Sequence, residues 1–133
     1  DKYGLNVVLV CTGEIFGQLG LSYTSPVEDN RREAIRRSKE IIDFASYLGA
    51  NINIGRVRGQ YCGQLSREET EELAVHAFRE LADYGAPKNV KIALETVTIM
   101  QTNFINTLAE AGGHGWSGVN QAQLQADDGL FSI

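Results

Sequence analysis

The sequence predicts an α/β fold in which parallel strands alternate with helices that cover the sheet. Three observations support this fold: apolar runs rich in β-branched residues, stripes of apolar residues at helical spacing between them, and a glycine at the end of each helix. The chain has 133 residues, of which 43% are hydrophobic and 22% charged. This composition predicts one ordered domain over residues 1–133.

The strands are expected in three apolar segments, residues 5–10, 51–57 and 90–97. A fourth short strand is expected at residues 122–126. Nearly continuous apolar strands that alternate with amphipathic helices are typical of a parallel sheet.

Two helices follow the same pattern of start and stop signals. Ser25, Pro26 and Glu28 predict a capping box for a helix that continues to Leu48 and ends at Gly49. Ser66 and Glu69 predict a second box, and that helix ends at Gly85.

A third helix is expected to begin near Thr102 and to include Phe104 and Ile105. It breaks in a glycine-rich segment, residues 112–118, which we interpret as either a loop or a disordered stretch.

The length of the repeating unit indicates which parallel architecture is present. A TIM-type (β/α)8 barrel needs roughly 250 residues, or about 31 per unit. The chain therefore holds about four (β/α) units, or half a barrel. A small doubly wound sheet also fits the length, but residues 11–17 lack the glycine spacing of its phosphate-binding turn.

Charge and cysteine content restrict the partners. The net charge of −5 and the isoelectric point near 5.0 argue against a nucleic-acid backbone or an anionic membrane. No apolar run approaches the length of a bilayer span, and the N-terminus does not resemble a signal peptide. Cys11 and Cys62 are too few for a disulfide framework. We therefore expect a cytoplasmic protein with two free thiols.

Candidate functional residues follow the strands, because parallel α/β folds place their sites at the carboxyl ends of the strands. They are Cys11, Glu14, Arg56, Arg58, Glu95, Asp127 and Asp128. Glu95 is the most informative, since a carboxylate within an apolar strand must be paired, protonated or bound to a metal. With Asp127 or Asp128 on an adjacent parallel strand, it predicts an oxygen site suited to Mg²⁺ or Mn²⁺.

Each of these interpretations has a structural alternative. The alternative for Glu95, which we favour less, is a strand-end glutamate paired with a neighbouring arginine. Arg56 and Arg58 either hold a substrate hydroxyl, carboxylate or phosphate, or form ion pairs on the rim of the sheet.

The chain resembles the xylose-isomerase-like sugar isomerases and epimerases, which share the (β/α)8 barrel. The resemblance is carried by Ser25-Pro26 with Arg31, by residues 45–50 and 54–56, and above all by residues 93–97 followed by 102–107. It implies that Glu95 is a metal ligand and one of two glutamates that exchange the substrate proton. It further implies that Asp127, or Asp128, is the metal aspartate and that the metal is Mn²⁺, Mg²⁺ or Co²⁺.

The same resemblance implies a sugar or sugar phosphate as substrate. The expected substrate contacts are Cys11, Glu14, Arg56, Arg58 and Gln101. Thr98, Ile99 and Gln101 depart from the family, where many members have Asn, Arg and Glu. The histidine ligand and the second glutamate belong to later strands that this sequence does not contain.

These observations lead to one leading hypothesis and two alternatives. The chain is a fragment or truncated member of a metal-dependent sugar isomerase or epimerase that moves a proton next to the carbonyl of a keto sugar. Alternatively it is a non-catalytic half-barrel scaffold, or a metal-dependent barrel related to endonucleases that act on abasic DNA. Four strands cannot close a barrel, so we expect a homo-oligomer or docking to a missing half. The expected uncovered face carries Val8, Val10, Ile52, Ile54, Ile92 and Leu94.

Overall fold

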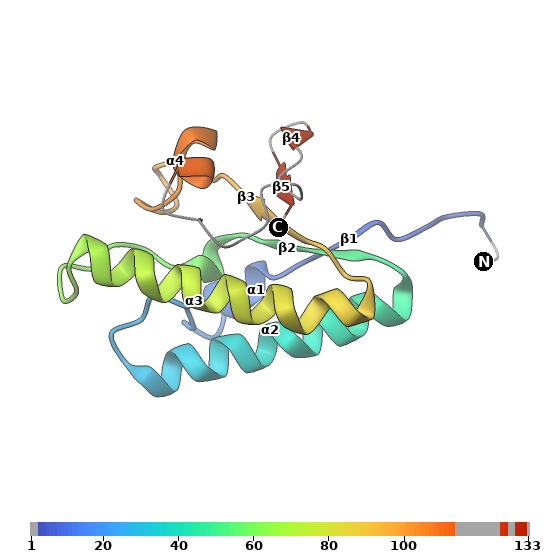
Figure 1. The fold of residues 1–133 in the computed structure, drawn as a ribbon, viewed down its shortest axis with the longest axis horizontal. Helices are drawn as coiled ribbons and strands as arrows, with labels where there is room; N and C mark the ends of the chain where they lie inside the picture. The colour runs from blue at the N-terminus through green and yellow to red at the C-terminus, as the bar shows by residue number, and fades with distance from the viewer. Residues whose placement is uncertain (1–2, 114–125, 128–129, 133) are drawn as a thin grey trace.

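The computed structural model describes residues 3–113, 126–127 and 130–132, which form a sheet with a layer of helices on one face (Figure 1). The first three strands lie side by side and parallel: β1 (Leu9–Cys11), β2 (Asn51–Ile54) and β3 (Ile92–Glu95). The predicted parallel α/β fold is confirmed, although each strand is shorter than its apolar segment.

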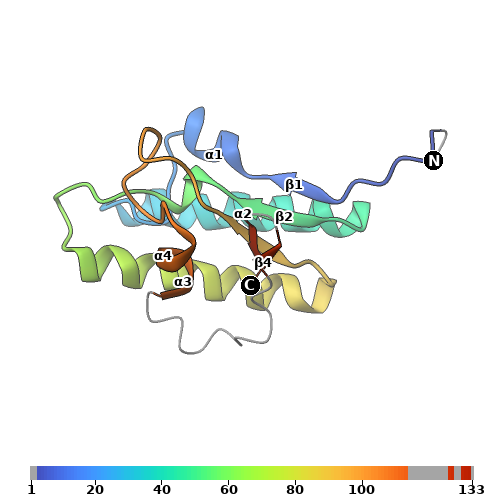
Figure 2. The same cartoon turned by 90° about the horizontal axis from the view of Figure 1, so that it is seen from above.

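Two long helices cover the sheet, α2 (Glu28–Leu48) and α3 (Arg67–Gly85), and they lie next to each other in both views (Figure 2). Short helical turns connect these elements: α1 (Gly13–Gly17) after β1, η1 (Arg56–Arg58) after β2, and η2 (Ala86–Lys88) before β3. No helix in the described part of the chain is both long enough and apolar enough to cross a membrane.

The hydrophobic core lies between the sheet and the two long helices. Ile52 and Ile54 of β2 and Ile92 and Leu94 of β3 are fully buried there against the helices. The expectation that these four side chains line an uncovered face is therefore wrong. Because side chains alternate along a strand, the opposite face carries Cys11, Asn53, Ala93 and Glu95.

The two predicted capping boxes have different outcomes. In α3, Ser66 Oγ accepts the Glu69 N–H at 3.1 Å and Glu69 Oε2 accepts the Ser66 N–H at 2.7 Å, so this box is confirmed. In α2 the helix begins at Glu28 with Val27 as N-cap, and Ser25 Oγ instead accepts the Val27 N–H at 3.2 Å. The Ser25 box is wrong.

The third helix begins later than predicted, as α4 (Leu108–Gly113). Phe104 and Ile105 lie in the preceding loop, where Ile105 has a φ of 56° that a helix cannot accommodate. The reason is competition for backbone groups: Arg58 donates hydrogen bonds to the carbonyls of Phe104 and Ile105 at 3.0 and 2.9 Å.

The described C-terminal residues form two further strands, β4 (Ala126–Asp127) and β5 (Leu130–Ser132). Both are antiparallel to their neighbours, and the strand order is β1-β2-β3-β5-β4. The prediction of a fourth parallel strand ending at Ala126 is therefore wrong. The sequence pattern at residues 122–126 carries no information on strand direction, and β5 pairs with both β3 and β4 through antiparallel bonds, which need no crossover connection.

Candidate functional site

Three side chains meet at the carboxyl ends of the parallel strands: Cys11 of β1, Asn53 of β2 and Glu95 of β3. Cys11 and Asn53 are paired in the sheet register, and Asn53 is paired with Ala93, two residues before Glu95. Asn53 Nδ2 donates to Glu95 Oε2 at 2.8 Å and lies 3.9 Å from Cys11 Sγ. Asn53 thus connects the side chains at the ends of all three strands.

At the same edge of the sheet, two hydrogen bonds from Thr12 join the end of β1 to β2. Thr12 is buried, and its Oγ1 donates to the Asn53 carbonyl at 2.9 Å while its N–H donates to the same oxygen at 3.0 Å. The strand end that carries Asn53 is therefore anchored on the side of β1.

Arg58 has a different position from the one expected of a substrate contact. Its side chain is fully buried, and its three guanidinium nitrogens donate to the carbonyls of Gly55, Glu95, Phe104 and Ile105 at 2.9–3.0 Å. Burial lowers the pKa of Arg58 to about 10, and the nearby charge of Glu95 opposes this effect. These contacts assign Arg58 to the framework around Glu95.

The other predicted substrate contacts lie around this edge of the sheet. Arg56 is half-buried, and its guanidinium stacks over the Phe16 ring of α1 at 4.8 Å. Its Nε is buried and has no hydrogen-bond partner among the described residues. Glu14 lies in α1 and Gln101 in the loop after β3, and both are exposed. Of the predicted substrate contacts, Cys11 thus lies beside the Asn53 side chain and Arg58 bonds the Glu95 main chain.

The predicted aspartates do not lie on a parallel strand next to β3. Asp127 belongs to β4, and β5 lies between β4 and β3, so Leu130 is paired with both Glu95 and Asp127. Asp128 lies outside the described residues. The expectation of two carboxylates on adjacent parallel strands is wrong for Asp127, because the hairpin places a third strand between them.

The described residues do not form a complete metal site. Among them, no group of three or more His, Cys, Asp or Glu side chains is placed to hold a metal ion. Glu95 offers one carboxylate, whereas hard divalent cations take about six oxygen ligands. The side chains described here therefore do not fit a divalent cation by themselves.

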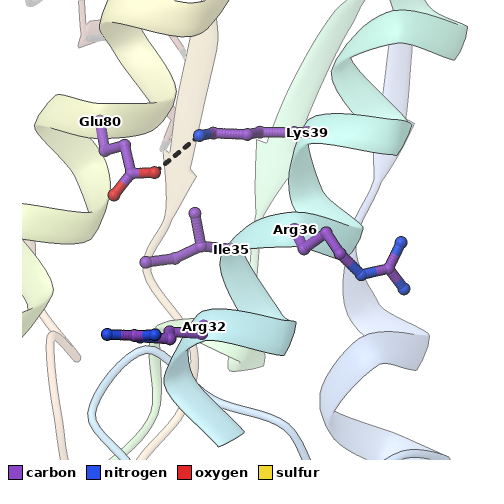
Figure 3. A pocket seen from close by; sticks show the side chains of 5 residues that line it. All are labelled: Arg32, Ile35, Arg36, Lys39 and Glu80. Carbon is purple, nitrogen blue, oxygen red and sulfur yellow. Dashed lines mark hydrogen bonds and ion pairs between the residues drawn. The ribbon is translucent and has the colours of Figure 1, made fainter. Parts of the chain in front are cut away.

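The helix layer carries a separate shallow pocket of about 220 Å³ between α2 and α3 (Figure 3). Ile35 lies at its centre, and Lys39 donates to Glu80 across it at 2.6 Å. Its basic side chains are paired with carboxylates, since Arg36 also contacts Glu33 and Glu40. None of its lining residues belongs to the strand ends, so this pocket is not continuous with the Glu95 site.

Sequence reasoning missed Asn53, the residue that connects the site. Its signal was present in the run Asn51-Ile52-Asn53-Ile54, where asparagine and isoleucine alternate with the period of a strand. Such alternation indicates one apolar face under the helices and one polar face. Reading the segment as uniformly apolar hid the polar face.

Comparison with known proteins identifies related folds. A family model described as a xylose isomerase-like TIM barrel matches residues 1–113. The L-ribulose 3-epimerase of Methylomonas sp. (strain DH-1) is 33% identical over 96 residues, which are 67% of this chain and 33% of that protein. The chain thus spans about a third of the length of this curated relative.

Two solved structures share the fold over 85% of the chain. The 3-keto-D-glucoside 4-epimerase YcjR from E. coli has a TM-score of 0.70 at 21% identity, and the chain covers 44% of it. The D-allulose 3-epimerase from Methylomonas sp. has a TM-score of 0.64 at 22% identity, and the chain covers 48% of it. These similarities support a partial barrel in the present chain.

Proposed function

Because the chain belongs to the xylose isomerase-like TIM-barrel family, we propose that it carries part of the active site of a sugar epimerase or isomerase. The substrate is a keto sugar or its phosphate. The reaction is proton transfer at the carbon next to the carbonyl. The observation that carries the proposal is the Glu95 carboxylate, held by Asn53 at the carboxyl end of β3.

Glu95 acts as the base in this proposal. Its carboxylate takes the proton from the carbon beside the carbonyl, and the electron pair of the broken C–H bond moves into an enediolate. Return of a proton to the opposite face inverts the carbon and completes epimerisation. Inversion needs a second acid on that face, which we assign to a part of the barrel beyond the described residues.

A divalent cation such as Mn²⁺, Mg²⁺ or Co²⁺ belongs to the proposal for the assembled barrel. When bound, it would stabilise the negative charge of the enediolate. Glu95 alone does not complete the ligand shell of the cation. In this proposal the remaining ligands are Asp127 or Asp128 of this chain and side chains of other strands. Those other strands belong either to a longer chain or to a second copy.

The surroundings of Glu95 suit a small polar substrate. Cys11 is exposed at the adjacent strand end, and Arg56 is partly exposed on Phe16, where its guanidinium can meet a hydroxyl or a phosphate. Cys11 and Cys62 are both free and exposed, which suits a reducing compartment, and we propose a cytoplasmic location.

Proton exchange tests this function directly. The 133-residue chain is incubated with D-ribulose, D-fructose or D-allulose and Mn²⁺ in D₂O, and deuterium at the carbon beside the carbonyl is measured by NMR. Exchange at one face of the carbon needs one base and no inversion, so the second acid is not required. We therefore expect slow incorporation with the wild-type chain and its loss in Glu95→Gln, which removes the base and keeps the shape.

The second candidate is a non-catalytic half-barrel scaffold. It is favoured by one observation, the incomplete metal site of the described residues. Equal deuterium incorporation with and without the chain, for all three ketoses, would support the scaffold and overturn the catalytic proposal.

A further inference from the structure

Three residues of one short stretch of the chain, from Asn53 to Arg58, lie against Glu95. Asn53 donates to the carboxylate at 2.8 Å, and Arg58 donates to the Glu95 carbonyl at 2.9 Å. Gly55 lies between them, and a Cβ there would come within 3.4 Å of Glu95 Oε2, at the near limit of ordinary contact. The end of β2 thus holds both the main chain and the side chain of Glu95.

The main chain of Glu95 is fixed by a fully buried guanidinium. The Nη1 of Arg58 bridges the carbonyls of Gly55 and Glu95, both at 2.9 Å, so it joins the ends of β2 and β3. Its other two nitrogens hold the loop that follows β3 at Phe104 and Ile105. Glu95 therefore has little freedom to move its backbone, and the direction of its carboxylate depends on the side chain.

Asn53 donates the hydrogen bond that the Glu95 side chain accepts. Because a carboxylate only accepts hydrogen bonds, the amide nitrogen of Asn53 must face Glu95. Asn53 is 5% exposed, and its Oδ1 is buried with no hydrogen-bond partner among the described residues. A buried unpaired oxygen is destabilising, and an apolar side chain of similar shape would avoid that cost. The benefit of asparagine at this position therefore lies in the bond that it donates.

We propose that Asn53 is a positioning residue that sets the direction of the Glu95 carboxylate toward the carbon from which the proton is taken. This inference rests on the proposed role of Glu95 as the base. Asn53 itself touches neither the substrate nor the transferred proton. Its effect is to keep one carboxylate oxygen bonded, so that the other oxygen has a fixed direction.

Two substitutions test the proposal, with a matched control. Asn53→Asp replaces the donor with a like charge next to Glu95, and Asn53→Leu removes the donor without adding a charge. The control is Asn51→Asp, two residues earlier on the same face of β2. Asn51 Oδ1 accepts the Lys91 N–H at 2.9 Å, and aspartate can keep that bond while adding the same charge.

The first readout is kinetic. We expect both Asn53 variants to lower kcat for deuterium exchange about 10²-fold with little change in KM, because misdirection of a catalytic group affects the chemical step. Asn51→Asp is expected to leave both constants unchanged. A proportional rise in KM with unchanged kcat, or full activity in both Asn53 variants, would overturn the proposal.

The second readout does not need activity. In the ¹⁵N-labelled full chain, the side-chain NH₂ resonances of Asn53 are compared between wild type and Glu95→Gln by NMR. We expect an upfield shift of one Asn53 amide proton in Glu95→Gln, while the Asn51 resonances stay in place, since Asn51 bonds to the main chain of Lys91. Unmoved Asn53 resonances would overturn the positioning role, even if the Asn53 variants fail to fold. If the Asn53 amide proton shifts as expected but the wild-type chain shows no deuterium exchange, the result would instead count against the catalytic role of Glu95.

Discussion

Gly59 has a backbone conformation and an environment that only glycine can accommodate. Its φ is 96°, and a Cβ there would overlap Thr24 Oγ1. Its carbonyl also accepts the Thr102 hydroxyl at 2.9 Å, so this residue joins the turn after β2 to the loop after β3. The backbone conformation of Gly59 is therefore fixed by its close approach to Thr24 and by the hydrogen bond from Thr102.

We expect Gly59→Ala to lower the free energy of unfolding by about 3 kcal/mol, because backbone strain and steric overlap act together. The matched control is Gly63→Ala, where φ is 75° but nothing lies within 4 Å of the added Cβ. Strain alone predicts a cost of about 1 kcal/mol there. Urea unfolding measures both, and equal costs would show that the overlap with Thr24 is relieved.

Tyr23 is a second residue whose environment determines a measurable property. It is 1% exposed, its ring meets Phe78 edge to face at 5.9 Å, and its hydroxyl contacts Ser38 Oγ at 2.6 Å. Burial raises the pKa of the Tyr23 phenol above its ordinary value, and the bond to Ser38 opposes this only in part. The folded protein therefore holds the phenolic proton more tightly than the unfolded chain.

This raised pKa predicts a loss of stability at alkaline pH. The contribution is fully present below the ordinary tyrosine pKa of about 10 and is lost as the pH rises above it, since only the unfolded state then ionises. We expect the free energy of unfolding to fall less steeply above pH about 10 in Tyr23→Phe than in wild type. Parallel pH profiles for the two proteins would contradict this assignment.

At the scale of elements, the sequence predicted the parallel order of three strands and two long helices, because both rest on local patterns. Gly49, with a φ of 67°, ends α2 as expected. Long-range contacts account for what was missed. Ser25 fits a capping pattern, but its carbonyl accepts a bond from Arg31 at 2.7 Å and the helix begins after it.

The two serines predict different costs for one substitution. We expect Ser66→Ala to lower the free energy of unfolding by about 1 kcal/mol, since it removes the side-chain acceptor of a capping box. Ser25→Ala should cost only a few tenths, roughly 0.3 kcal/mol, because Ser25 bonds a residue outside the helix. Chemical denaturation of both variants measures the difference, and a larger cost at Ser25 would restore the original interpretation of that segment.

The candidate site was predictable only where it depends on local sequence patterns, and not where it depends on long-range contacts. Glu95 stood out because a carboxylate interrupts an apolar strand, and its place at the end of β3 follows from the strand pattern. Arg58 could not be assigned, because its four carbonyl partners lie up to 47 positions away in the sequence. Whether an arginine meets substrate or buries itself among carbonyls depends on the fold of those distant loops.

At the scale of the whole molecule, the sheet has an unprotected edge. Among the described strands, β1 lies at one end of the order, and only three of its residues pair with β2. The preceding segment runs outward from the body toward the N-terminus (Figure 1). Leu5 and Val8 in this segment are 75% and 73% exposed. Exposed apolar residues next to an open edge strand are a common route to association.

We therefore expect the 133-residue chain to associate with a second copy through this edge, since burying apolar area contributes about 25 cal/mol per Å² against the entropy of association. Light scattering at several micromolar concentrations should show a dimer that Val8→Lys weakens at least about tenfold, as a charge opposes pairing at a strand edge. The control is Phe44→Lys, because Phe44 is also exposed, at 54%, but lies on α2 away from β1. A monomer at all concentrations would exclude this interface. Equal weakening by both variants would place the contact on the helix layer instead.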